Sequence, residues 1–95
     1  MSTKEEFVRK MHSKLDVWNA EIDTLTAKAG AAEAGARTEY HKQIEALRSK
    51  RDEARDKLKT LESASEGAWQ DLKAGVELAW DAVSEAVSSA TSRFK

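Results

Sequence analysis

The sequence predicts an all-α protein, and three observations point to that class. Apolar side chains recur every three or four residues along most of the chain, which places them on one stripe of a helix. No proline interrupts the pattern, and 35% of the residues are charged, as in long helices or coiled coils. Because the apolar residues are periodic rather than scattered, we expect a folded chain, with one helical domain over residues 1–95.

We call this apolar stripe the seam, because it predicts the surface along which helices pack. Its spacing alternates three and four in the N-terminal third, which is the heptad pattern of coiled coils. The seam comprises Met11, Leu15, Trp18, Ile22, Leu25, Tyr40, Ile44, Leu47, Leu58, Leu61, Trp69, Leu72, Val76, Trp80, Val83 and Val87. Smaller or terminal positions continue it at Val8, Ala29, Ala36, Ala54 and Phe94.

The first helix is expected to begin at about Thr3. Ser2 or Thr3 can cap its start, and Glu5 and Glu6 follow where a carboxylate closes a capping box and suits the helix dipole. The favoured prediction is one amphipathic helix that continues from about 3 to 62. Such a helix spans about 90 Å at a rise of 1.5 Å per residue.

The stretch 27–36 leaves an alternative open. Gly30 and Gly35 each cost a helix interior about 1 kcal/mol relative to alanine, whereas the alanines around them are the best helix formers. No proline and no Asn-Gly or Asp-Gly turn is present, so a continuous helix is slightly favoured. The alternative is a turn near Gly30–Gly35, which gives a three-helix bundle that buries the seam within one chain.

The clearest break is predicted at about 63–67. Ser63 and Glu66 have the spacing of a second capping box, and Ser65 and Gly67 lower the helix propensity. A C-terminal helix is therefore expected over about 65–92. It forms a helical hairpin or coiled coil with the long helix, or it continues that helix.

The C-terminal helix contains an 11-residue repeat. The segment EGAWQDLKAGV (66–76) aligns with ELAWDAVSEAV (77–87), and Leu72 matches Val83. A period of 11 residues corresponds to about 3.67 residues per turn, so its stripe stays nearly straight along a helix.

Composition argues against several classes of function. The formal charge of −1 lacks the basic excess of nucleic-acid binders, so we expect no nucleic-acid partner. Cysteine is absent, which excludes disulfides and thiolate metal sites. Residues 1–10 do not resemble a signal peptide, and no apolar run is long enough to span a bilayer. We therefore expect a cytoplasmic protein.

No motif predicts catalysis, a cofactor or a metal. His12 and Asp16 lie one helical turn apart, but such isolated pairs rarely bind metal. We also interpret His41 as a solvated side chain. Phosphate-binding loops and nucleophile motifs are absent, so we expect no catalytic, cofactor-binding or metal-ligating residues and a non-enzymatic role.

The three tryptophans are expected to pack in the seam, because each one falls on it. Since an indole N–H needs a partner, Trp18, Trp69 and Trp80 are expected near the edge of the packing. The alternative function is binding to a lipid surface through the C-terminal repeat. The polar face of that helix disfavours anionic lipid, because one lysine opposes five carboxylates (Lys73 against Glu66, Asp71, Glu77, Asp81 and Glu85).

A thin helical element exposes its seam unless another chain covers it. We therefore expect a homo-oligomer that self-associates through the seam, in a structural or interaction role. A client protein is a further expected partner.

Three stretches carry a family resemblance, and they are KLDVWNAEID (14–23), EYHKQIEALRSKRDEARDKL (39–58) and AWQDLKAGVELAWDAV (68–83). In these stretches, and in the closing SRFK, the chain resembles a family of small bacterial coiled-coil stress-response proteins. The resemblance implies a cytoplasmic, non-enzymatic helical protein linked to stress. It supplies no catalytic residues.

Overall fold

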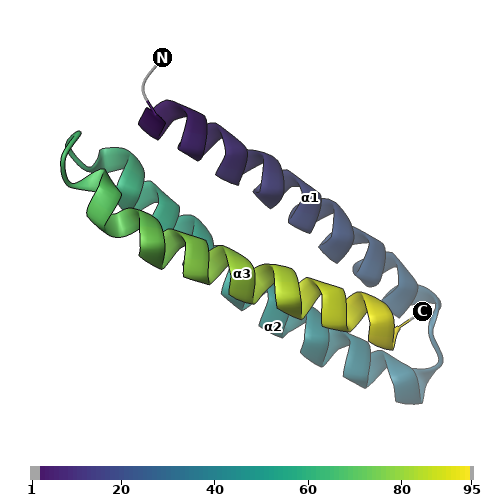
Figure 1. Cartoon of the computed structure of the whole chain (residues 1–95). Helices are drawn as coiled ribbons and strands as arrows, with labels where there is room; N and C mark the ends of the chain where they lie inside the picture. Colours follow the sequence, from purple (N-terminus) through teal and green to yellow (C-terminus); the bar gives the residue numbers. More distant parts are fainter. Residues whose placement is uncertain (1–2, 95) are drawn as a thin grey trace.

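Three α-helices make up nearly all of residues 3–94, the part of the chain that the computed structural model describes (Figure 1). Helix α1 covers Thr3–Ala31, α2 covers Ala34–Ser63 and α3 covers Trp69–Arg93. They form an up-down-up bundle whose Cα atoms extend over 51 × 19 × 18 Å. The all-α class is therefore confirmed. Ser2, one of the two expected caps, lies outside the described residues.

The seam forms the core of this bundle. Its large side chains from all three helices join in one apolar cluster, and residues 3–94 contain no buried polar or charged residue. Because the three stripes face one another, the chain covers most of its seam without a second copy. The buried residues are Phe7, Met11, Leu15, Trp18, Ile22, Leu25, Ala29, Ile44, Leu47, Ala54, Leu58, Leu61, Trp69, Val76, Trp80, Val83, Val87 and Ala90.

The continuous helix over 3–62 is wrong, because the chain turns at Ala32–Glu33. This position falls inside the Gly30–Gly35 range of the alternative. Glu33 is extended, with φ −64° and ψ 154°, and its carbonyl accepts the first hydrogen bonds of α2. The Arg37 guanidinium donates back to the Ala32 carbonyl at 3.0 Å. The turn therefore closes with one extended residue and one side-chain contact.

Neither glycine makes this turn. Gly30 lies in the last turn of α1 and Gly35 in the first turn of α2, and no described glycine has a positive φ. The physical reason for the turn lies in the seam instead. Between Leu25 and Tyr40 the seam holds nothing larger than alanine, so folding back there lets α1 and α2 bury each other's larger side chains.

The second connection covers residues 64–68, one residue later than the predicted break at 63–67. Ser63 is the last residue of α2, and Ala68 precedes α3 without a side-chain cap, so the Ser63–Glu66 capping box is wrong. The Ser65 carbonyl instead accepts hydrogen bonds from the N–H groups of Ala68 and Trp69 at 3.1 Å. A backbone turn therefore starts α3, and the helix begins at Trp69 rather than near 65.

Candidate functional site

The seam is the first candidate surface, and most of its predicted residues are buried inside the chain. Leu72 and Tyr40 are the exceptions, and 37% of Leu72 is exposed at the edge where α2 and α3 meet. Tyr40 and Phe94 are half-buried, and their rings stack with centroids 4.0 Å apart. Near the N-terminus Phe7 is buried and Val8 is only half-buried.

Aromatic side chains join α1 to α3 across the core. The ring centroids of Trp18 and Trp80 lie 5.2 Å apart, and those of Phe7 and Trp69 lie 6.0 Å apart. Large rings fill the space between these helices, which approach each other less closely than either approaches α2. The α1–α3 contact therefore includes two pairs of large aromatic side chains.

The tryptophans do not lie at the edge of the packing. Trp80 is only 1% exposed, and its indole N–H donates to the Met11 carbonyl at 3.3 Å. Trp18 and Trp69 are also buried. The Met11 carbonyl of α1 therefore satisfies the Trp80 indole N–H inside the core, and not at the edge of the packing where we expected it. All three indoles face the core, so none lies on the surface of the closed bundle.

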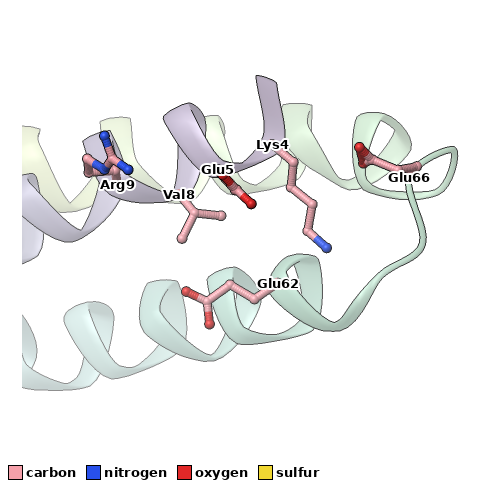
Figure 2. A pocket seen from close by; sticks show the side chains of 6 residues that line it. All are labelled: Lys4, Glu5, Val8, Arg9, Glu62 and Glu66. Carbon is pink, nitrogen blue, oxygen red and sulfur yellow. The ribbon is translucent and has the colours of Figure 1, made fainter. Parts of the chain in front are cut away.

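The end of the bundle near the N-terminus carries a shallow hollow lined by charged side chains (Figure 2). The lining residues are Lys4, Glu5, Val8 and Arg9 of α1, Glu62 of α2 and Glu66 of the connection between α2 and α3. The Lys4 ammonium donates to the Ala64 carbonyl at 2.7 Å. This contact ties the start of α1 to the connection between α2 and α3. The hollow is lined by both acidic and basic side chains, so it offers no single charge to a ligand.

His12 pairs across the bundle and not with Asp16. Its Nε2 lies 2.6 Å from Glu62 Oε1, and half of the imidazole is exposed. Across residues 3–94, no three histidine or acidic side chains gather closely enough to hold a metal ion. The contact therefore links α1 to α2.

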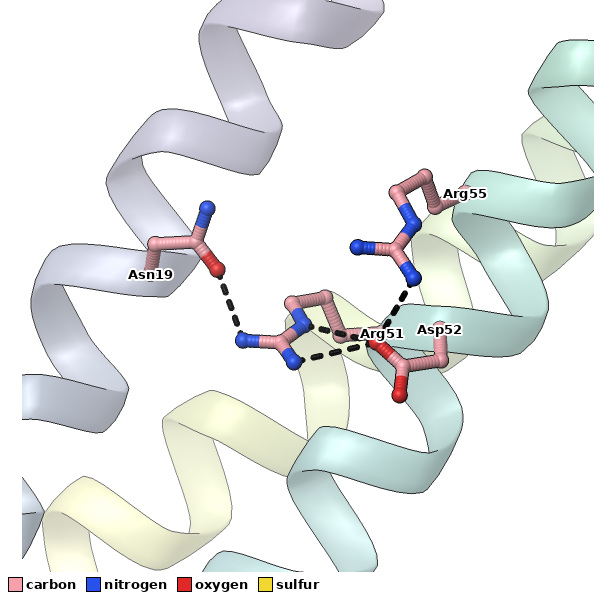
Figure 3. A network of polar contacts seen from close by, with 4 residues as sticks. All are labelled: Asn19, Arg51, Asp52 and Arg55. Atoms are coloured by element: carbon pink, nitrogen blue, oxygen red, sulfur yellow. Dashed lines mark hydrogen bonds and ion pairs between the residues drawn. The ribbon is translucent and has the colours of Figure 1, made fainter.

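A second polar cross-link joins α1 to α2 near the middle of the rod (Figure 3). The Arg51 guanidinium donates to Asn19 Oδ1 at 2.9 Å and to Asp52 Oδ1 at 3.0 Å. Arg55 also reaches Asp52 Oδ1 at 3.5 Å. The bond to Asn19 links α2 to α1, while Asp52, the neighbour of Arg51 on α2, holds the guanidinium from its own helix.

The surface between α2 and α3 is the second candidate. We define the α2–α3 face by two shallow hollows, one lined by Lys57, Thr60, Asp71, Leu72 and Gly75 and the other by residues that include Ala46, Lys50, Ala82 and Glu85. Leu78 lines neither hollow but lies next to both on α3, three residues after Gly75 and four before Ala82, and 71% of it is exposed. Sequence reasoning missed this face, because Leu78 lies off the seam.

Comparison with known proteins adds no relative. Family models, curated proteins and solved structures were each searched, and none of them matches this chain. Within residues 3–94, no helix combines the length and the apolar character that crossing a bilayer requires.

Proposed function

We propose that this chain is a non-enzymatic structural protein of the bacterial cytoplasm that self-associates through its seam. The observation that carries the proposal is the single apolar cluster that runs through all three helices. Apolar burial does not depend on direction, so the same side chains stabilise contacts within one chain or between two. Self-association through the seam then requires helices of two copies to cover one another.

The α2–α3 face provides the control for this proposal. Leu47 in the seam is 1% exposed and Leu78 on the face is 71% exposed, so the two leucines separate core from surface. Leu47→Asp places a carboxylate in the core and is expected to unfold the chain. Leu78→Asp leaves the core intact and is expected to preserve both helicity and association.

Sedimentation equilibrium of the full chain over about 1 μM to 1 mM tests the proposal, at concentrations that cover typical weak association. We expect a mass above the monomer's 10.5 kDa that rises with concentration. A mass of 10.5 kDa at every concentration refutes self-association. If Leu78→Asp alone abolishes it, the α2–α3 face and not the seam carries the contact.

The link to stress rests on the family resemblance described above. We propose that under stress the seam is also offered to client proteins with exposed apolar surface. Light scattering of a heat-denatured test protein, with and without a molar excess of this chain, measures that activity. We expect slower aggregation with the chain present, and an unchanged rate refutes the client role.

A further inference from the structure

The turn between α1 and α2 is short and contains no residue that prevents a helix. Only Ala32 and Glu33 separate helices of 29 and 30 residues, and Gly30 and Gly35 on either side are already helical. No proline is present, and Glu33 at φ −64° needs only a change of ψ to become helical. Straightening the chain into one helix over residues 3–63 therefore requires only the two residues Ala32 and Glu33 to become helical.

The seams of α1 and α2 also share one phase across this turn. Met11, Ala29 and Leu47 are spaced 18 residues apart, which is five turns at about 3.6 residues per turn. Buried pairs 36 residues apart, ten turns, repeat the match, and they are Trp18 with Ala54, Ile22 with Leu58 and Leu25 with Leu61. Straightening the turn therefore places both seams on a single stripe.

From this phase and this turn we infer that two copies share the seam by exchanging α1. In the exchanged dimer each chain has one continuous helix over residues 3–63. The α1 segment of each chain packs on α2 and α3 of the other chain. The inference rests on the proposed self-association and names its partner, a second copy, and its mechanism, the straightening of the Ala32–Glu33 turn.

The contacts of the closed bundle recur between the two chains. The Trp18–Trp80 and Phe7–Trp69 ring contacts, and the donation from Trp80 to the Met11 carbonyl, each join α1 to α3 and so pass to the partner. The bond from Arg51 to Asn19 becomes a contact between chains in the same way. The closed monomer and the exchanged dimer thus contain the same contacts. Chain concentration and the conformation of the turn therefore decide which of the two forms is populated.

Alanines lie where the two long helices cross. In a straight helix the stripe passes through Ala29, Ala36 and then Tyr40, so small side chains occupy the seam around the former turn. Small residues let two helix backbones approach closely. The stretch 27–36, whose glycines weaken a continuous helix, is therefore also the place where the long helix of a second copy can pack closely.

Ala34→Pro tests the inference, because proline fits the closed turn and opposes the straight helix. Position 34 is the first residue of α2, where proline is tolerated, and the extended Glu33 before it has the conformation that precedes proline. Inside a continuous helix, proline makes each straightened turn about 100-fold less populated. We expect the association constant to fall by at least that factor while helicity is kept. Ala34→Gly, which lowers helix propensity without the ring clash, is the control and is expected to have a much smaller effect.

A distance measurement provides the independent readout. The chain has no cysteine, so Ser13→Cys and Lys59→Cys give two unique sites for spin labels, both exposed in the bundle. In the closed bundle these sites lie on neighbouring antiparallel helices, less than about 25 Å apart. In a straight helix they are separated by about 70 Å at 1.5 Å per residue. The labelled chain is refolded at high concentration with excess unlabelled chain, so that only distances within one chain are detected.

The outcomes separate the two proposals. Oligomers with a distance near 70 Å within one chain, lost in Ala34→Pro, are the expected result. Oligomers that keep the short distance overturn the exchange of α1 and leave self-association standing. A monomer at every concentration overturns both.

Discussion

Trp80 is the largest fully buried side chain in residues 3–94, so its truncation should be one of the most destabilising changes in the chain. The side chain is 1% exposed, contacts the Trp18 ring and donates to the Met11 carbonyl. An aromatic side chain of this size buries about 150–250 Å², which corresponds to about 4–6 kcal/mol at roughly 25 cal/mol per Å². Measured truncations of buried tryptophan to alanine cost about 3–5 kcal/mol. A domain of this length is stable by about 5–14 kcal/mol, so Trp80→Ala removes a large share of it.

Trp80→Phe separates the ring from its hydrogen bond. Phenylalanine keeps most of the apolar surface but loses the donation to Met11, so we expect a cost of about 1–2 kcal/mol. Urea unfolding followed by circular dichroism at low chain concentration gives both free energies. Val17→Ala, at a side chain that is 58% exposed, is the matched control and should change stability by less than about 0.5 kcal/mol. A loss below about 1 kcal/mol for Trp80→Ala would refute the burial of this ring.

Three further predictions concern single positions. Gly75→Ala in the middle of α3 should raise stability by about 0.5–1 kcal/mol in urea unfolding, because a Cβ there meets nothing within 4 Å. A lower midpoint would mean that this site is crowded. Val83→Ala should cost more stability than Leu72→Ala, although the two positions match in the repeat, because Val83 is 1% exposed and Leu72 is 37% exposed. Thermal melts that show equal losses of stability for Val83→Ala and Leu72→Ala would contradict this expectation. His12→Ala should cost less than about 1 kcal/mol of stability, because the contact of His12 with Glu62 is largely exposed. A loss above about 1 kcal/mol, measured at high salt, would contradict this expectation.

The periodicity of the sequence predicts the core well because burial depends on which face of a helix a residue occupies. Met11, Leu47 and Trp80 are separated by long stretches of chain, yet each follows from spacing of three and four alone. The rule places Val8 on the seam, three residues before Met11, but the buried side chain is Phe7, four residues before it, because spacing alone allows either one. Leu72 shows the limit, because a residue at the edge of a stripe is covered only if a neighbouring helix extends over it.

The turn at Ala32–Glu33 could not be predicted with the same certainty. Local propensity favours a helix through the alanines, and no residue there requires a turn. The turn results from long-range packing, which buries Trp80 against Met11 and also brings the exposed side chains of His12 and Glu62 together. The contacts of Lys4 and Arg37 with backbone carbonyls could not be predicted from the sequence either, because they depend on where the helices end. The α2–α3 face could not be predicted either, because it forms only where α2 and α3 lie side by side.

The up-down-up order places the two ends of the described chain at opposite ends of a rod 51 Å long (Figure 1). A pull on those ends therefore acts along the helix axes, and the helices must slide past one another before the bundle opens. In that direction the aromatic contacts at Phe7, Trp18 and Tyr40 bear the load together instead of breaking in sequence. Under tension the lifetime of the bundle is set by its unfolding rate. We therefore expect the bundle to resist a pull along its long axis for longer than a pull that peels one helix away from the other two.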